Sequence, residues 1–164
     1  MTPITGVSHD GRYAHLRLEG RQASVGNFAA ANGLDFVDAK QSSLGLYWAE
    51  LRHQQAQFFA NEADIWQLSL PKWSDLSDQA LSVSDLPYLM DWAGARYWVR
   101  ASGAEVEKLK AAVSSLKGYL QSYSGDPHSQ FPAWSPTLLR LHHKLKQAYD
   151  PAGILNPGRL FTSL

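Results

Sequence analysis

The sequence predicts an α+β fold in which helices pack on one face of an antiparallel sheet. The chain has 164 residues, which is the size of a single domain. Hydrophobic residues make up 45% of the chain and charged residues 18%, as in globular proteins. Strand patterns follow one another across tight turns, and such hairpins build antiparallel sheets. We therefore expect one domain that spans residues 1–164.

The chain begins with a predicted hairpin and a helix. Residues 4–8 and 13–18 alternate as strands, and Asp10-Gly11 suits the turn between them because both residues tolerate positive φ. Residues 21–32 place their apolar side chains on one face of a helix. Gly33 provides the left-handed stop that ends this helix.

The next segments are predicted as a strand, a helix and a strand. A short strand spans residues 34–37. A helix follows over residues 43–60, because apolar side chains recur at offsets of three, four and seven and Ser43 suits the N-cap. Residues 65–70 alternate as a strand that ends at Pro71, which has no N–H for the ladder.

A predicted loop and a second hairpin follow. Residues 71–87 are rich in Ser and Asp and have no clean period, which is typical of a surface loop. Residues 88–92 and 96–100 are strand patterns on either side of an Ala-Gly-Ala turn. Residues 119–123 add one more strand.

Two further helices are marked by their N-terminal residues. Ser102-Gly103-Ala104-Glu105 is a capping box, in which the Ser and Glu side chains each accept a hydrogen bond from a first-turn N–H, and Gly118 ends the helix. Trp134-Ser135-Pro136 starts the last helix with a hydrophobic-staple residue, an N-cap Ser and a first-turn Pro. The predicted order of elements is β-β-α-β-α-β-β-β-α-β-α.

Composition excludes several function classes. Lys and Arg total 15 and Asp and Glu total 15, so the chain lacks the net positive charge of nucleic-acid-binding proteins, and no nucleic acid is expected as a partner. The sequence has no Cys, which excludes disulfides, thiolate metal sites and iron–sulfur clusters held by this chain. Its glycines include no Gly-x-Gly pair, so we expect no dinucleotide bound by this chain alone.

We expect a soluble, cytoplasmic protein. The N-terminus has neither the basic start nor the apolar stretch of a signal peptide. No segment approaches the roughly 18 apolar residues of a membrane span, so direct membrane insertion is not expected. Any association with a membrane would then run through partner subunits.

Two histidine-containing motifs give little catalytic signal. Ser8-His9-Asp10 has the residue types of a hydrolase triad, but neighbours on a strand point to alternate faces and cannot form a relay. His142 and His143 point to different sides of a helix, which argues against a shared metal ion. From the residues alone, the catalytic site stays unassigned and no metal site is expected.

The second hairpin carries opposite charges on its two strands. With its turn at Gly94-Ala95, the hairpin places Asp91 and Arg96 on one face, where they could form a charge-assisted pair. Ala93 and Trp98 would share that face. One interpretation is a structural clip across the hairpin. The other is a pair that faces a ligand or a partner, because charges near the centre of a sheet need a reason.

The C-terminal run, residues 150–161, has dense backbone control. Pro151 ends the preceding helix, Gly153 allows left-handed φ, and Asn156-Pro157-Gly158 forms a tight turn. A helix terminator followed by an anchored tail explains all of these residues except Arg159. A rigid turn that presents Arg159 beside two apolar residues is typical of a docking edge.

This C-terminal segment resembles a known family. Residues 141–161, which end in Asp-Pro-Ala-Gly-Ile-Leu-Asn-Pro-Gly-Arg-Leu-Phe, are similar to the C-terminal ending of FAD-linked oxidases of the vanillyl-alcohol-oxidase type. In that family a helix, Asp-Pro, a short loop and Asn-Pro-Gly-Lys/Arg close the chain against the flavin domain. Residues 16–20, 48–52 and 91–98 further resemble the FAD-binding subunits of glycolate oxidases.

The resemblance implies a C-terminal cap domain with a ferredoxin-like fold, and a flavin-binding domain that is absent from this chain. FAD would bind in the full-length protein, with none expected on this chain alone. Asn156, Gly158 and Arg159 would then face the flavin domain. Asp91 and Arg96 would lie on the substrate side.

The implied function is a contribution to the FAD-dependent oxidation of glycolate to glyoxylate, by a chain that is not active alone. Catalytic subunits of this kind carry Ala/Pro-Gly-Asp-Gly-Asn-x-His and Glu-His-Gly stretches, and their absence here favours an accessory or electron-relay role. The implied partners are the flavin-binding domain and other glycolate oxidase subunits, including an iron–sulfur subunit. The alternative is a non-enzymatic α+β interaction module or accessory subunit that binds a partner through its exposed sheet.

Overall fold

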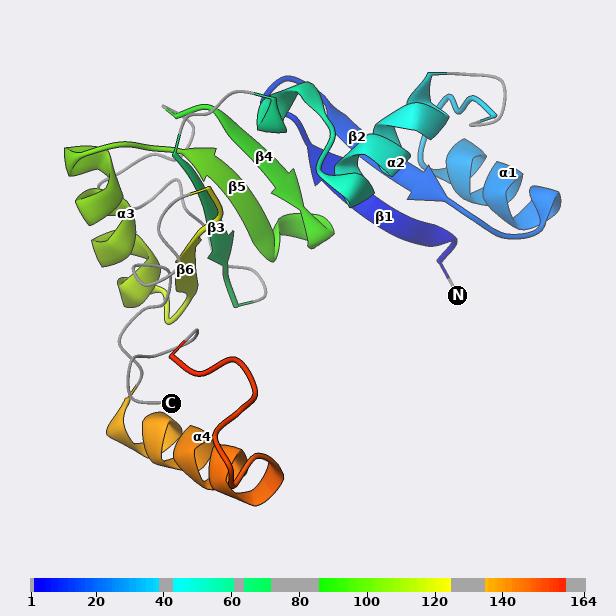
Figure 1. Ribbon diagram of the computed structural model, residues 1–164. Coiled ribbons are helices and arrows are strands. Elements are labelled where there is room, and N and C mark those ends of the chain that lie inside the picture. Colours follow the sequence, from blue (N-terminus) through cyan, green and yellow to red (C-terminus); the bar gives the residue numbers. More distant parts are fainter. Residues whose placement is uncertain (1, 39–42, 61–63, 72–85, 125–134, 159–164) are drawn as a thin grey trace.

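The structure is a computed structural model that describes residues 2–38, 43–60, 64–71, 86–124 and 135–158. Six strands of this part of the chain form one antiparallel sheet in the order β2-β1-β4-β5-β3-β6 (Figure 1). The predicted α+β class with an antiparallel sheet is confirmed. The strands are β1 (Ile4–His9), β2 (Ala14–Leu18), β3 (Ile65–Ser69), β4 (Tyr88–Asp91), β5 (Arg96–Arg100) and β6 (Tyr119–Ser122). The α-helices are α1 (Gln22–Ala31), α2 (Leu44–His53), α3 (Ala104–Ser115) and α4 (Pro136–Tyr149).

Strands β3 to β6 form the centre of the fold. Their order, β4-β5-β3-β6, places the first strand of the group between the third and the fourth, which is the strand order of ferredoxin-like sheets. The hairpin of β1 and β2 extends this sheet through a single pair, His9 with Met90. The strand order therefore agrees with the ferredoxin-like arrangement that the resemblance implies.

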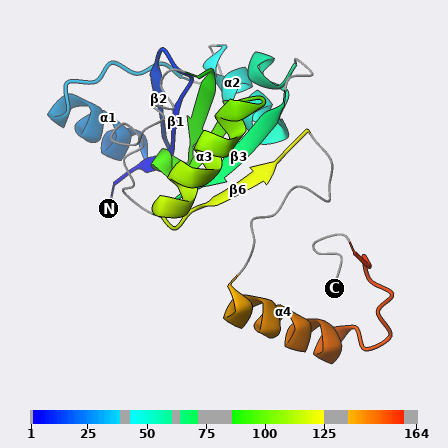
Figure 2. The same cartoon turned by 90° about the vertical axis from the view of Figure 1, so that its left-hand side faces the viewer.

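Helices cover both faces of the sheet, so the prediction that they pack on one face is wrong. Trp98 and Val99 are neighbours on β5 and therefore point to opposite faces. Val99 packs with Leu109 of α3, whereas Trp98 packs with Leu51 of α2. Figure 2 shows α3 in front of the central strands. The physical reason is that β5 buries consecutive apolar side chains, which require cover on both sides.

The hairpin of β1 and β2 is confirmed, and its turn is built around Asp10. One carboxylate oxygen of Asp10 accepts hydrogen bonds from the N–H groups of Arg12 and Tyr13, at 2.8 and 2.7 Å. Gly11 adopts a φ of +92°, which favours glycine. The side chain of Asp10 thus replaces a backbone acceptor in the turn.

The strand predicted over residues 34–37 does not form. Residues 34–38 adopt neither strand nor helix, and Phe36 and Val37 are more than half exposed. Their apolar pattern is therefore not used in the described sheet. Two other predictions lie at the limit of the described residues: most of the loop predicted over 71–87 and the staple residue Trp134 fall outside them.

The helix predicted over residues 43–60 is shorter than expected. Helix α2 ends at His53 because Gln54 takes a left-handed φ of +57°. The remaining apolar residues form a separate 3₁₀ helix, η2 (Gln57–Phe59). Its Phe59 packs against Trp98, on the face of the sheet that α2 covers. Ser43, predicted as the N-cap, makes no side-chain capping hydrogen bond with the described residues.

The N-terminal caps of the last two helices are confirmed in part. The carboxylate of Glu105 accepts a hydrogen bond from the N–H of Ser102 at 3.0 Å, which is one half of the predicted capping box. At the start of α4, the hydroxyl of Ser135 accepts a hydrogen bond from the N–H of Leu138 at 3.3 Å. Pro136 occupies the first position of α4, as predicted.

Gly118 follows α3, but the left-handed residue at this helix end is Lys117, with a φ of +57°. Glycine is required at position 118 by close packing. A Cβ there would lie 2.7 Å from Leu70 Cδ2 and 2.8 Å from the carbonyl oxygen of Ser69. The turn after α3 therefore passes directly against the end of β3.

Gly118→Ala is expected to lower the free energy of unfolding by about 1–3 kcal/mol, because the added methyl group overpacks this contact. Urea denaturation followed by circular dichroism measures the change. Gly26→Ala in α1 is the matched control, since a Cβ there meets no atom within 4 Å and should be neutral or stabilising. Equal unfolding free energies for Gly118→Ala and the wild type would contradict the prediction.

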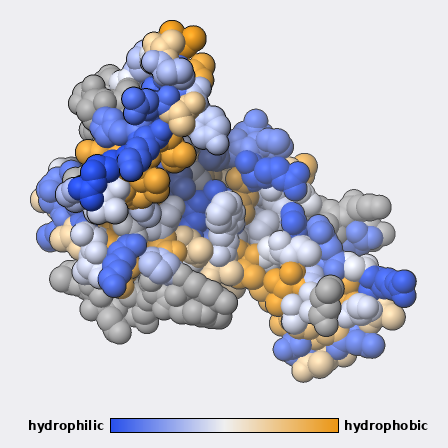
Figure 3. Space-filling model, turned by 90° about the horizontal axis from the view of Figure 1, so that it is seen from below, coloured by the Kyte–Doolittle hydropathy of each residue, from blue (hydrophilic) through white to orange (hydrophobic). Residues whose placement is uncertain are grey.

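Helix α4 lies apart from the sheet in Figures 1 and 2. None of its side chains is buried by the described residues, and Leu141, Leu145 and Tyr149 are 52%, 45% and 83% exposed. These three residues are spaced four apart and therefore share one side of the helix. Figure 3 shows that hydrophobic residues form several separate patches among hydrophilic ones on this face of the molecule. The described chain thus leaves an apolar side of α4 uncovered.

Candidate functional site

The predicted pair of Asp91 and Arg96 forms where β4 ends and β5 begins. The register places the two residues directly opposite each other, and Arg96 Nη2 donates to Asp91 Oδ2 in an ion pair. Asp91 Oδ1 accepts a hydrogen bond from the N–H of Trp92 at 2.7 Å. Both carboxylate oxygens are therefore engaged, and Asp91 is only 8% exposed.

Two indole rings flank Arg96. Its guanidinium carbon lies 4.4 Å from the centroid of the Trp92 ring and 5.2 Å from that of Trp98, within the range of cation–π attraction. Trp92 and Ala93 belong to the 3₁₀ turn η4 (Trp92–Gly94), with φ values of +51° and +54°. Such values are strained for residues that carry a Cβ. Ala93 thus lies in a strained turn, which the contacts of Asp91 and Arg96 hold in place.

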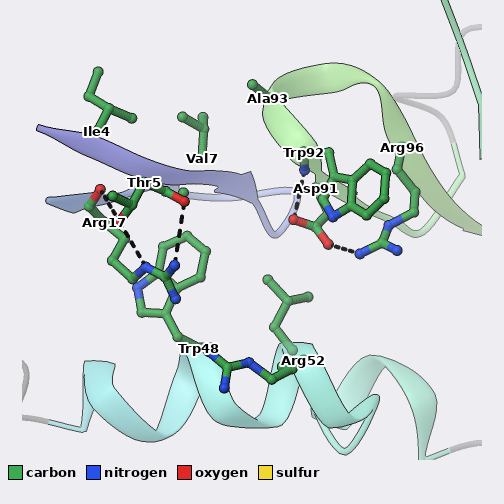
Figure 4. Close-up of a pocket in the computed structure, with 12 residues that line it drawn as sticks. Ile4, Thr5, Val7, Arg17, Trp48, Arg52, Asp91, Trp92, Ala93 and Arg96 are labelled. Atoms are coloured by element: carbon green, nitrogen blue, oxygen red, sulfur yellow. Dashed lines mark hydrogen bonds and ion pairs between the residues drawn. The ribbon is translucent and has the colours of Figure 1, made fainter. Parts of the chain in front are cut away.

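A cleft of about 650 Å³ lies beside this pair, between α2, the hairpin of β1 and β2, and η4 (Figure 4). Apolar side chains from β1 form part of its wall. Its charged and aromatic lining consists of Arg17, Trp48, Arg52, Asp91, Trp92 and Arg96. The structure therefore brings the predicted pair to the edge of a concave site.

The arginines of the cleft differ in their partners. Arg17 donates from Nε to Thr5 Oγ1 at 3.1 Å and lies 3.3 Å from a carboxylate oxygen of Glu19. Arg96 is paired with Asp91. Arg52 is exposed on α2, and no carboxylate of the described residues pairs with it. Arg52 is thus the cation of this cleft that is available to a ligand.

Sequence reasoning found the pair in the hairpin but missed Arg17 and Arg52 as lining residues of a site. Part of the signal is present in the sequence, because Trp48 and Arg52 are four residues apart and share one side of a helix. Their meeting with the hairpin depends on α2 packing against the face of the sheet that was expected to lack a helix. No local pattern indicates that packing.

The run after α4 is organised by Asp150, which sequence reasoning did not single out. Its carboxylate accepts hydrogen bonds from the N–H groups of Ile154 and Leu155, at 3.0 and 2.9 Å, and pairs with Lys146 Nζ at 2.6 Å. The hydrogen bond from Lys146, followed by that from Leu155, lowers the pKa of Asp150 below its usual value. One carboxylate thus connects the end of α4 to the loop that follows it.

The predicted turn at Asn156-Pro157-Gly158 is formed. Asn156 and Gly158 have φ values of +47° and +66°, so both are in the left-handed region that these residue types tolerate. Asn156 is exposed and Gly158 is partly exposed. Arg159, the third residue predicted to face the flavin domain, lies outside the described residues.

The side chains of Ser8, His9 and Asp10 contact three different partners. Ser8 is buried and shares a hydrogen bond of 2.7 Å with the hydroxyl of Tyr47. The ring of His9 lies within hydrogen-bond distance, 3.1 Å, of the hydroxyl of Tyr88. Asp10 contacts a ring nitrogen of His15 at 3.0 Å. These contacts form no Ser–His–Asp relay, in agreement with the prediction.

Hydrogen bonds give Asp10 an unusually low pKa. Burial is the largest single influence and raises the pKa, but hydrogen bonds from the Tyr13 N–H, His15 and the Arg12 N–H together outweigh it and lower the pKa from 3.8 to about 2. The charged carboxylate therefore stabilises the folded state above pH 3.8. This contribution is lost as the pH falls toward 2.

Asp10→Asn is expected to lower the free energy of unfolding at pH 6, and the difference from the wild type should shrink as the pH falls to 3. Urea denaturation of both proteins at pH 6, 4.5 and 3 measures this trend. Glu107→Gln, which changes an exposed carboxylate of α3, is the control for a general loss of charge. A difference that stays constant between pH 6 and pH 3 would contradict the assigned pKa.

Within the described ranges, no group of three or more His, Asp or Glu side chains is arranged to hold a metal ion. No helix in the described part of the chain combines the length and apolar character needed to cross a bilayer.

Comparisons with known proteins agree with the resemblance. Residues 132–160 match the family described as FAD linked oxidases, C-terminal domain. An alignment of 164 residues, which covers 99% of this chain, is 33% identical to the glycolate oxidase subunit GlcE of Escherichia coli (strain K12). The chain spans 43% of the length of that relative. No solved structure matches the chain. The C-terminal segment of this chain is thus similar to the C-terminal domain of FAD-linked oxidases, and the chain over almost its whole length is similar to GlcE.

Proposed function

We propose that this chain is the C-terminal cap domain of a flavoprotein subunit of a glycolate oxidase, and that it contributes to the FAD-dependent oxidation of glycolate to glyoxylate. The similarity to GlcE carries this proposal, because it extends over 99% of the chain rather than over one motif. The oxidation removes two electrons and two protons from an alcohol, and bound FAD supplies the acceptor for the electrons. The chain's own side chains would cover and shape the site.

The described residues do not fit the binding of a whole FAD. A dinucleotide pyrophosphate is usually held at a helix N-terminus that follows a glycine-rich loop. The cleft instead meets α2 through Trp48, Leu51 and Arg52, which lie in the middle and the C-terminal half of that helix. The sequence also has no Gly-x-Gly pair. We therefore place the flavin on a domain outside this chain.

The proposed contact with that flavin-binding domain is α4 and the turn that follows it. Supporting observations are the uncovered apolar side of α4 and the fixed backbone at Asn156 and Gly158. The match to the family model falls on this same segment. Arg159 completes the proposed contact as the cation of the Asn-Pro-Gly-Arg turn.

Asp91 and Arg96 are proposed to lie on the substrate side. Both line the cleft, and both oxygens of Asp91 are already hydrogen-bonded. Asp91 is therefore better suited to hold Arg96 in position than to accept a proton from a substrate. The proposed partners are other glycolate oxidase subunits, including an iron–sulfur subunit, and the proposed location is the cytoplasm, with any membrane contact through those subunits.

A chimera tests the proposal. This chain replaces the matching segment of GlcE in Escherichia coli cells that lack native GlcE, and glycolate-dependent dye reduction is measured in extracts. We expect the chimera to restore activity to within tenfold of native GlcE. GlcE without the replaced segment is the control and should be inactive.

The interaction-module alternative predicts a different result. In that case the truncated control would retain its rate of dye reduction, and this chain would change only the assembly of the subunits. A chimera that is expressed, assembled and loaded with FAD at the native level, but does not oxidise glycolate, would contradict the proposed function. FAD content is read from the absorbance of the purified complex.

A further inference from the structure

We propose that the cleft between α2 and the β1–β2 hairpin binds an organic carboxylate with a body larger than that of glycolate. Arg52 would contact the carboxylate, and Trp48 and Trp92 would flank the body of the ligand (Figure 4). This inference deepens the proposed function and rests on it for the placement of the cleft on the substrate side, but binding here requires neither a flavin nor turnover.

The size of the cleft indicates a ligand larger than a two-carbon acid. Its volume of about 650 Å³ lies within the range of roughly 300–1,000 Å³ that is typical of sites for drug-sized molecules. Such sites bury most of the surface of their ligands. Glycolate would fill a small part of this cleft and leave its apolar wall in contact with water. A ligand with an apolar body of several more atoms matches the cleft better.

The charges of the cleft indicate a single negative charge on the ligand. Arg17 is close to Glu19, and Arg96 is paired with Asp91, so these two cations are largely neutralised. Arg52 has no acidic partner in the described part of the chain. One guanidinium group binds one carboxylate through two parallel hydrogen bonds. A phosphate, with a charge of about −1.5 to −2, would carry more negative charge than Arg52 alone can neutralise.

The two tryptophans suit a ligand that carries an aromatic ring. Trp48 lies close to β1 because position 6 is glycine: a Cβ at Gly6 would come within 3.1 Å of the Trp48 ring. Trp92 is 67% exposed, although it sits on a strained turn and under the guanidinium of Arg96. Core packing does not explain such an exposed indole. Flat aromatic surfaces on two sides of a cleft favour stacking or edge contacts with a ring.

Isothermal titration calorimetry of the whole chain tests the site, with mandelate as the probe. Mandelate joins one carboxylate to an aromatic ring, mandelamide has the same body without the charge, and glycolate has the charge without the ring. We expect mandelate to bind at least tenfold more tightly than mandelamide and at least tenfold more tightly than glycolate. Phenyl phosphate should bind no more tightly than mandelate.

Matched variants assign the contacts. Arg52→Gln should weaken the binding of mandelate at least tenfold, to the level of mandelamide. Arg21→Gln, which changes an exposed arginine just before α1 and outside the cleft, should leave the affinity unchanged. Trp92→Ala should weaken the binding of mandelate at least threefold and have little effect on the binding of glycolate. Both cleft residues are exposed, so the variants should keep the wild-type circular dichroism spectrum.

Three results would overturn the inference. The first is no heat of binding for mandelate, or equal affinities for mandelate and mandelamide. The second is an affinity for glycolate or phenyl phosphate that exceeds that for mandelate. The third is an Arg52→Gln variant that binds mandelate as tightly as the wild type. Since no flavin is present in these titrations, failure of the chimera would leave their outcome unaffected, and the two proposals fail separately.

Discussion

Trp98→Ala is expected to lower the free energy of unfolding by about 3–5 kcal/mol, the range for loss of a buried large aromatic side chain. Trp98 is 2% exposed and packs with Leu51, Ile65 and Leu89. Its ring centroid also lies 5.2 Å from that of Phe59. The substitution removes a large side chain of the central sheet from its contact with α2 and η2, and the rigid strands around it cannot close the cavity.

Urea denaturation followed by far-UV circular dichroism measures this loss. Trp92→Ala is the matched control, because it removes the same side chain from the same hairpin at a position that is 67% exposed. We expect the control to lose less than about 1 kcal/mol. If Trp98→Ala does not fold, Trp98→Phe gives a smaller loss that can be measured. Equal losses at positions 92 and 98 would show that the contact between the sheet and α2 contributes little to stability.

The sequence predicts the local elements of this fold well where their determinants are local. The hairpin at Asp10-Gly11 forms because a carboxylate next to glycine supplies its own turn acceptor. The start of α4 at Ser135 follows from a hydroxyl that caps the helix. Residues 34–37 fail as a strand because an apolar run becomes a strand only when a neighbouring strand pairs with it. Pairing partners are not encoded within such a short segment.

The site is predictable to a smaller extent for the same reason. Asp91 and Arg96 are five residues apart, and the hairpin register alone brings them together. Arg52 reaches the same cleft from a different element, and its position depends on how α2 packs against the sheet. Helix α2 packs on the face of the sheet opposite α3. The prediction of helices on a single face placed no helix on that second face. Long-range packing therefore determines the part of the site that the sequence does not indicate.

The two interpretations of the Asp91–Arg96 pair lead to different experimental results. As a structural clip, the pair would stabilise the hairpin and leave ligand affinity unchanged when it is removed. As a pair that faces a ligand, its removal would change the affinity of the cleft for the ligand even in protein that is fully folded. Both carboxylate oxygens of Asp91 are bound within the hairpin, so we expect the clip to account for most of its contribution.

Asp91→Asn is expected to lower the free energy of unfolding by about 2–3 kcal/mol, because it leaves the charge of Arg96 without its partner in a partly buried site. The side chains of Asp91 and Arg96 are 11% and 21% exposed, so water screens the unpaired charge only in part. Urea denaturation of the wild type and the variant measures the loss. Glu107→Gln is the control for the loss of an exposed carboxylate that also forms an ion pair, and it should lose less.

A double-mutant cycle with Arg96→Gln separates the pair from its surroundings. If the pair is a clip, Asp91→Asn/Arg96→Gln should be more stable than the sum of the single losses predicts, because two neutral amides can still form a hydrogen bond across the hairpin. Mandelate should then bind to Asp91→Asn within threefold of its wild-type affinity under conditions where the variant is folded. Additive losses, or a tenfold change in affinity, would instead assign the pair to the ligand side, since the charge would then act mainly on the cleft.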